Sequence, residues 1–323
     1  MLIRQKLIIA LIKCSGGSTT RLKLVKQVFL LRQHLSPRYT HAFYQFLPYK
    51  YGPFSFTLYH ELQKMIDSGL IELPSSNAIR LTDLGLQTSL DLPPNLWKEF
   101  GRFWANYGQY PVNELTELVY AQHPWYATRS ERNRHYIPLK EAPYAVYTVG
   151  YSSMQVDGFL NLLLRSGIKQ LIDVRRNAVS RVFGFYGSTL ANLAKYVDIE
   201  YRHMPQVGIP SEWRACLDDQ DDLDMLFNRY TEEVLNSAED LVRDIASWMS
   251  SKPSTLMCME VDPSRYHRSV LAESISDSTG LTVSDLRWPN GNRLSSNTCI
   301  DNGHDVSSSI TRVQGTSMYC RDH

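Results

Sequence analysis

The chain has 323 residues, of which 43% are hydrophobic and 21% are charged, with a net charge of +1, and these values are typical of a globular protein of two domains. No apolar run approaches the roughly 20 residues needed to cross a bilayer, and the N-terminus shows no small-residue cleavage site, so we expect a cytoplasmic protein without a membrane partner. Five scattered cysteines without a CxxC pair argue against a disulfide framework and against a structural zinc site.

The near-zero net charge hides an asymmetry between the two halves of the chain. Residues 1–140 hold 17 lysines and arginines against nine acidic residues, a balance of +8, whereas the remaining residues hold 17 against 24, a balance of −7. A basic N-terminal half favours a polyanion-binding module attached to a second domain, although chance composition would give the same numbers.

The N-terminal region predicts helices followed by a hairpin. Apolar residues recur at helical spacing over residues 3–35, interrupted by Gly16–Thr19, where Ser18 or Thr19 can cap the second helix. A further helix is expected from Phe56 to Ser68, and "LIELPSSNAIRLTDLG" then reads as two short strands and a turn. Helix, helix, helix, hairpin is the element order of a winged helix.

Two segments of this region resemble known domains. "MIDSGLIEL…AIRLTDLG" resembles the end of a winged-helix recognition helix followed by its wing, and "YKYGPFSFTLYHELQKM" resembles the Tyr-Gly-Pro segment of helical domains of the Panacea type, over about 50 residues. We therefore predict a winged-helix-like nucleic-acid-binding domain over residues 1–140, with duplex DNA as its partner. Its candidate DNA-binding residues are Arg21, Lys23, Lys26, Lys50 and Arg80.

Two further helical patterns lie within residues 95–130, the second starting at Pro111 and ending in an aromatic and basic cluster. Trp125, Tyr126 and Arg129 of this cluster either clamp nucleic acid or pack the domain together.

From Tyr144 the pattern changes to alternating strands and helices. Strands are expected near 144–150, 169–174, 199–204, 254–261 and 281–287, and helices near 155–166, 188–196, 225–251 and 267–278. This alternation predicts an α/β fold, a Rossmann-like and mainly parallel sheet with helices on both faces, over residues 141–290. Residues 291–323 are rich in Ser, Asn, Gly and Asp and are expected to form a disordered tail.

Polar residues follow each of the first four strands of this domain. Since the carboxyl ends of parallel strands meet at one edge of a sheet, we expect these side chains to converge on a pocket for anionic ligands. The candidate catalytic residues are Tyr151, Asp173, Glu260 and His267. The candidate ligand-binding or phosphate-binding residues are Ser152, Arg175, Arg176, Ser180, Arg181, His203, Arg268 and Ser269.

Each of these residues has a purely structural alternative. Asp173 pairs with Arg175 or Arg268 in that interpretation, Arg176 and Arg181 are solvated loop charges, and His203 is a packed core residue. The start of the helix at His267 is the most specific signal, because free backbone N–H groups and a neighbouring arginine favour an anion there. No HxH or HxxxH spacing supports a metal site, so neither a metal nor a cofactor is expected.

The combination of motifs from Tyr144 to Leu286 resembles the family called domain of unknown function 488. The resemblance rests on "YTVGYSS", "LIDVRRNAVSR", "YRHMP" and "CMEVDPSRYHRS". The family often has cysteine immediately before His-Arg, and this chain has Tyr266 there, so thiol chemistry is not expected at this position. The resemblance implies a Rossmann-like domain and no particular reaction.

Three functions fit these features. The first is a DNA-acting, metal-independent hydrolase that cleaves a bond in a nucleotide, preferably the N-glycosidic bond of a modified base in phage defence, with phosphodiester hydrolysis as the alternative chemistry. The second is a non-catalytic DNA-binding sensor or regulator whose C-terminal domain binds a nucleotide or another phosphorylated ligand. A small-molecule hydrolase with a protein-binding N-terminal domain is the third.

Overall fold

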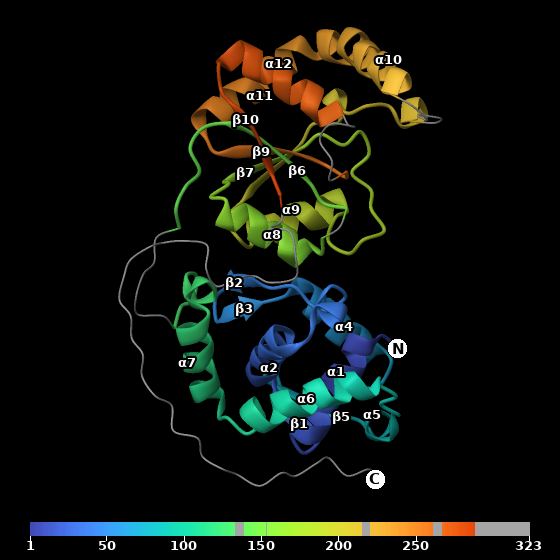
Figure 1. Ribbon diagram of the computed structural model, residues 1–323, viewed down its shortest axis with the longest axis vertical. Coiled ribbons are helices and arrows are strands. Elements are labelled where there is room, and N and C mark those ends of the chain that lie inside the picture. Colours follow the sequence, from blue (N-terminus) through green and yellow to red (C-terminus); the bar gives the residue numbers. More distant parts are fainter. Residues whose placement is uncertain (133–138, 153, 215–219, 261–266, 288–323) are drawn as a thin grey trace.

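The computed structural model describes residues 1–132, 139–152, 154–214, 220–260 and 267–287. Figure 1 shows a mostly helical N-terminal part and a C-terminal part built around one sheet. The predicted tail, 291–323, lies outside the described residues. No described helix is long and apolar enough to span a membrane.

The N-terminal part consists of helices and short antiparallel strands. Its elements are α1 (Ile3–Cys14), β1 (Ser18–Thr20), α2 (Arg21–His34), α3 (Pro37–Thr40), β2 (Leu47–Tyr49), β3 (Gly52–Phe54), α4 (Phe56–Asp67), β4 (Ile71–Glu72), β5 (Ala78–Leu81), α5 (Asp83–Gln87), α6 (Pro94–Tyr107), α7 (Val112–Gln122) and a 3₁₀ turn (Pro124–Ala127). The strands β1, β5 and β4 form one antiparallel sheet, and β2 and β3 form a separate hairpin.

The expected order of three helices and a hairpin is present, with α3 and the β2–β3 hairpin inserted before the third helix, α4. Thr20, rather than Ser18 or Thr19, caps α2 by accepting a hydrogen bond from Lys23 N at 3.2 Å. The prediction was off by a residue or two because β1 runs as far as Thr20, so α2 begins only at Arg21 and Thr20 is the residue that precedes its first turn.

The C-terminal part alternates strands and helices, as the sequence predicts. Its elements are β6 (Val146–Gly150), α8 (Val156–Arg165), β7 (Gln170–Asp173), α9 (Gly187–Lys195), β8 (Glu200–His203), short 3₁₀ turns (Pro205–Val207 and Ser211–Arg214), α10 (Gln220–Tyr230), π and 3₁₀ segments (Thr231–Leu235 and Asn236–Ala238), α11 (Glu239–Ser251), β9 (Ser254–Cys258), α12 (His267–Thr279) and β10 (Val283–Leu286). The single helix expected over 225–251 is therefore divided into α10, the π and 3₁₀ segments, and α11.

All five strands run parallel in the order β10-β6-β9-β7-β8. The chain moves outward from β6 to β7 and β8 through α8 and α9, and returns to β9 and β10 through α10, α11 and α12. Figure 1 shows α8 and α9 on one face of the sheet and α10, α11 and α12 on the other. The sheet is therefore doubly wound, and each face buries its own apolar core.

The two parts are joined by buried polar contacts. Asp157 of α8 is fully buried and caps the start of α4, accepting hydrogen bonds from Ser55 Oγ at 3.1 Å, Phe56 N at 2.5 Å and Thr57 N at 3.1 Å. A Cβ atom on the next residue, Gly158, would lie 1.8 Å from Gln45 Oε1, so the backbones approach closely there.

The aromatic and basic cluster at the end of the N-terminal part packs against the same junction. Trp125 Nε1 donates to Asn161 Oδ1 of α8 at 2.8 Å, and Arg129 pairs with Asp198 at 2.5 Å. Tyr126 is buried. The sequence left open whether this cluster clamps nucleic acid or packs the domain together, and in the structure it packs against the C-terminal part.

Candidate functional site

The carboxyl edge of the sheet is the place where the chain reverses its winding direction. Loops leave β6 and β7 toward the α8 and α9 face, whereas β9, which lies between them, is followed by α12 on the opposite face. Diverging loops of this kind open a crevice outside the carboxyl ends of the strands. Both sides of β9 have this arrangement.

Glu260 follows β9 at this edge and is half-buried. The loop after β6 lies beside it, because Tyr151 N and Ser152 N donate to Met259 O at 3.0 and 2.8 Å. Ser152 is exposed. The structure thus brings the predicted residues Glu260 and Ser152 together.

Asp173, at the end of β7, is fully buried and its carboxylate is saturated with hydrogen bonds. Oδ1 accepts from Arg175 N at 3.1 Å and Arg175 Nε at 2.8 Å, and Oδ2 accepts from Arg175 Nη2 at 2.5 Å and Tyr201 OH at 2.7 Å. Pairing with Arg175 was the structural alternative for this residue. In this structure Asp173 is therefore held as part of a buried cluster, with all four hydrogen bonds coming from Arg175 and Tyr201.

The side-chain donors of Arg175 are also occupied by hydrogen bonds within this cluster. Its Nη1 donates to Tyr151 OH at 3.0 Å and to Phe185 O at 2.9 Å, and its side chain is 5% exposed. Burial lowers the pKa of Arg175, but the hydrogen bonds and negative charge of Asp173 outweigh burial and raise that pKa above its ordinary value. Arg175 therefore fixes the loop after β7 through these internal contacts.

Tyr151 is buried and stacks on Phe185 with ring centroids 4.0 Å apart. In this structure its ring is covered and its hydroxyl accepts from Arg175, so Tyr151 packs against the loop after β7.

Tyr201 was not among the predicted residues, although it completes the cluster. Burial, followed by the charge of Asp173 and the hydrogen bond to it, raises the pKa of Tyr201. The alternation of side chains along β8 places Tyr201 and His203 on the same face, which is the signal that would have found it. His203 is half-buried, and its Nε2 lies 2.8 Å from Arg175 O.

Arg268, in the first turn of α12, is fully buried. Its Nη1 donates to Glu260 O, and its Nη2 lies 3.3 Å from Asp285 Oδ1 of β10. In this structure Arg268 ties the backbone after β9 to β10, which lies on the far side of β6 in the sheet. Asp285, missed by the sequence analysis, also accepts from Thr148 Oγ1 at 2.6 Å.

The remaining candidates of this domain lie in α12 and in the loop after β7. His267 is the first residue of α12, and its side chain is outside the described residues, whereas Ser269 is half-buried in the same turn. In the loop, Arg176 is exposed and donates from Nη1 to Pro205 O at 3.2 Å, and Arg181 is exposed. Ser180 Oγ accepts from Val182 N at 3.1 Å.

The predicted DNA-binding cations differ in accessibility. Arg21 and Lys23 are half-buried, and the exposed Lys50 and Arg80 pair with Glu131 at 3.5 Å and Glu72 at 2.7 Å.

Lys26 must be removed from that set. It is fully buried, donates to Tyr51 O and lies 5.2 Å from the ring centroid of Tyr120. Burial, with a smaller effect of Arg132, lowers the pKa of Lys26 to about 7. The helical periodicity of α2 predicts that Lys26 lies on a polar face opposite the apolar one. In the structure, however, the middle of this helix is buried on all sides, so Lys26 does not reach solvent.

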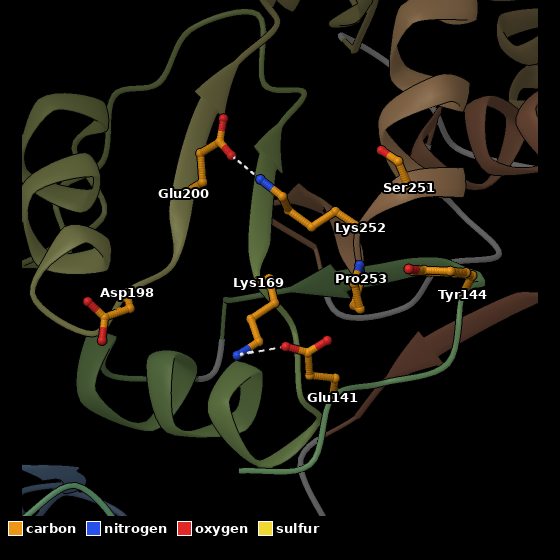
Figure 2. Close-up of a pocket in the computed structure, with 8 residues that line it drawn as sticks. All are labelled: Glu141, Tyr144, Lys169, Asp198, Glu200, Ser251, Lys252 and Pro253. Carbon is orange, nitrogen blue, oxygen red and sulfur yellow. Dashed lines mark hydrogen bonds and ion pairs between the residues drawn. The ribbon is translucent and has the colours of Figure 1, made fainter. Parts of the chain in front are cut away.

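Two cavities lie away from the carboxyl edge. One, of about 380 Å³, is formed at the amino ends of the strands, where Lys169 pairs with Glu141 at 3.4 Å and Lys252 with Glu200 at 2.6 Å (Figure 2). The second, of about 550 Å³, lies between the two parts of the chain and shares Glu141, Lys169 and Asp198 with the first. Several of the charges that line these cavities pair with one another, and the cavities do not include the predicted catalytic or phosphate-binding residues, although Lys50 of the predicted DNA-binding set lines the second.

Among the described residues, no group of three or more His, Cys, Asp or Glu side chains is arranged to hold a metal ion.

Residues 155–275 match the model of the family described as domain of unknown function DUF488. The matched segment runs from the start of α8 into α12 and so contains most of the doubly wound sheet. Neither the curated proteins nor the solved structures contain a match to this chain.

Proposed function

We propose that this protein is a DNA-acting enzyme whose N-terminal part binds DNA and whose C-terminal sheet cleaves the N-glycosidic bond of a nucleotide, with Glu260 as the essential carboxylate. One observation carries the proposal: Glu260 follows β9, the strand flanked on both sides by a reversal of winding direction. Ligands of doubly wound folds bind at such positions.

The chemistry requires one well-placed carboxylate. The bond between the sugar C1′ and the base nitrogen breaks, and a water oxygen bonds to C1′ while Glu260 takes the proton from that water. The same carboxylate, while ionised, stabilises the positive charge that develops on the sugar. The departing base takes a proton, for which His267 is the predicted donor.

The supporting groups of this site differ from those expected from the sequence. With Asp173, Arg175 and Arg268 held in buried hydrogen bonds, the groups accessible to a backbone phosphate are Ser152, Arg176 and Arg181. Arginine guanidinium groups suit this role, because they donate in a bidentate geometry to phosphate oxygens.

DNA binding by the N-terminal part is supported by its charge balance of +8 over residues 1–140 and by its element order. The helices α1, α2 and α4 with the sheet β1-β5-β4 have the order of a winged helix, in which α4 is the third helix and β4–β5 is the wing. A cytoplasmic role in defence against foreign or modified DNA belongs to the same proposal.

A second function is favoured by the Asp173–Arg175 cluster. A carboxylate and an arginine that saturate each other form a rigid support for binding and contribute no reacting group, which suits a DNA-binding sensor that holds a nucleotide or another phosphorylated ligand at the same edge.

The test uses the full-length chain with plain and modified duplex DNA, with and without EDTA, followed by assays for abasic sites and strand breaks. We expect abasic sites with the wild type, unaffected by EDTA, and at least a ~100-fold loss of rate in Glu260→Gln with DNA affinity unchanged. Glu273→Gln, an exposed residue of α12, is the matched control and should behave as the wild type. Tight DNA binding by the wild type without any product would replace the enzyme with the sensor.

A further inference from the structure

We infer that the loop of residues 176–186, between β7 and α9, is a wedge that inserts apolar side chains into bound DNA beside the site at Glu260. This inference rests on the proposed function in one respect, that DNA is the ligand. It adds a contact surface and a mechanical role that the site residues themselves do not supply.

The wedge loop is held in a fixed shape by contacts at its two ends. Arg175 Nη1 donates to Phe185 O at 2.9 Å, Gly187 N donates to Ala178 O at 2.8 Å, and the ring of Phe185 is fully buried against Tyr151. Phe185 N also donates to Val182 O at 3.2 Å, which closes a turn within the loop. The buried Asp173–Arg175 cluster therefore anchors this loop.

The middle of the wedge loop presents apolar side chains to water. Val179 is 66% exposed, Val182 is 47% exposed and Tyr186 is 51% exposed. Three such residues on one short segment leave apolar surface in water, so the arrangement favours a partner that covers them. Branched aliphatic side chains of this kind enter between base steps in proteins that kink or open a duplex.

Charge identifies the partner as a polyanion. Arg176 precedes the two valines, Arg181 lies between them, both arginines are exposed, and the sequence from Val174 to Val197 contains no aspartate or glutamate. Guanidinium groups placed beside an apolar tip can contact the phosphates next to the base step that the tip enters.

The wedge loop also continues the surface of the N-terminal part. The ring of Phe183 stacks on His60 of α4 with centroids 4.0 Å apart and an angle of 7° between the planes. Lys64, one turn further along α4, is exposed on the same side of that helix. A DNA backbone that binds along α4 would therefore also contact the wedge loop.

The position of the loop explains what the wedge accomplishes. It begins at Arg176, three residues after Asp173 ends β7, and β7 is the immediate neighbour of β9, which Glu260 follows. An enzyme that acts on a base in a duplex has to extrude that base from the stack, at a cost of a few kcal/mol. Insertion of the valines keeps the vacated space filled while the nucleotide occupies the carboxyl edge.

The experiment measures DNA opening separately from DNA binding. The full-length protein is titrated into duplex DNA containing 2-aminopurine, whose fluorescence rises when the base leaves the stack, and affinity is followed in parallel by anisotropy. We expect a fluorescence gain with the wild type. The double variant Val179→Ser/Val182→Ser should lose most of that gain while its affinity stays within about threefold, because phosphate contacts dominate affinity.

Two further variants complete the design. Arg176→Gln/Arg181→Gln should bind about tenfold more weakly and show a smaller dependence of affinity on salt, since two phosphate contacts are removed. Val283 of β10 is 45% exposed and lies outside the loop, so Val283→Ser is the control and should match the wild type in both fluorescence gain and affinity. Circular dichroism and thermal melting confirm that each variant is folded.

The outcomes separate the wedge from the proposed reaction. A fluorescence gain that depends on the two valines, without abasic product from any DNA, supports the wedge and removes the glycosidic chemistry. A double variant equal to the wild type overturns the wedge and leaves the reaction standing. Bound DNA with no fluorescence gain in any protein overturns the wedge, and the assay for abasic sites then decides the reaction separately. Binding to anionic lipid vesicles in place of DNA overturns the wedge and the DNA-acting function together.

Discussion

Asp173 and Asp157 are both fully buried carboxylates of the same domain, and the structure stabilises them in opposite ways. Asp173 meets the full positive charge of Arg175, two residues away in the chain. Asp157 meets only hydrogen-bond donors, the backbone N–H groups of Phe56 and Thr57 and the hydroxyl of Ser55, about a hundred residues away. A local ion pair fixes a loop, whereas a remote helix cap joins two domains.

The absence of a positively charged partner affects the pKa of Asp157. Burial raises the pKa of Asp157 to about 6, even though its hydrogen bonds with Thr57, Phe56 and Ser55 lower it. The donors at the start of a helix carry only partial charges, so they do not replace all the hydration that the carboxylate loses.

The largest expected effect comes from separating the local pair. Arg175→Ala leaves the buried charge of Asp173 without its guanidinium and removes the donors to Tyr151 OH and Phe185 O, so we expect a loss of about 5 kcal/mol in the free energy of unfolding. Urea denaturation measures it. Arg175→Lys should recover part of the loss, since it restores a charge without the bidentate geometry; a loss below about 1 kcal/mol in Arg175→Ala would mean that the pair does not hold the loop.

The second effect comes from the remote cap. Asp157→Ala leaves Phe56 N and Thr57 N buried without an acceptor, and we expect a loss of about 4 kcal/mol in the free energy of unfolding. The same denaturation experiment measures it, with Asp240→Ala, at an exposed position of α11, as the control that should change little. Equal stability of the two variants would contradict the role of Asp157 at the junction.

The third effect is the pH dependence of the cap. The pKa of Asp157 in the folded chain, about 6, lies above its value of 3.8 in an unfolded chain, so the folded state retains a proton that the unfolded state releases between these values. The stability difference between the wild type and Asp157→Asn should therefore fall by up to about 3 kcal/mol as pH rises from about 4 to about 6, and stay constant above that. A difference that rises over this window would show that the carboxylate is stabilised in its charged form.

The smallest effect is expected at the neighbouring arginine. Arg176 follows Arg175 directly but is exposed, and its contact is a single hydrogen bond to Pro205 O at 3.2 Å. Arg176→Ala should change the free energy of unfolding by less than about 0.5 kcal/mol. A larger loss would move Arg176 from the ligand-facing surface into the supporting cluster.

The sequence predicted the C-terminal fold well because each element carries its own local signal. The strand expected near 169–174 is observed at Gln170–Asp173, and the helix expected near 267–278 at His267–Thr279. Apolar runs, helical periodicity and turn residues are properties of neighbouring residues, so they survive without knowledge of the tertiary structure.

The candidate site was predicted less completely, since burial is decided by distant elements. The sequence left open whether Asp173 pairs with an arginine, and the answer depends on Tyr201 from the next strand and on Phe185 above the loop. Asp285 of β10 likewise receives Arg268 from α12. No spacing within the chain specifies these encounters, because they arise only when the strands take their order in the sheet.

The cap on α4 has a consequence for any attempt to divide this chain. An expression fragment that stops before Asp157 would carry a helix α4 in which Phe56 N and Thr57 N have lost their acceptor, and the complementary fragment would present a carboxylate without its donors. A chimera that replaces the N-terminal half with another sequence would have to keep three hydrogen-bond donors to Asp157 at the start of α4. Asp157 is thus one of several contacts on which the junction of the two parts depends, together with Trp125–Asn161 and Arg129–Asp198.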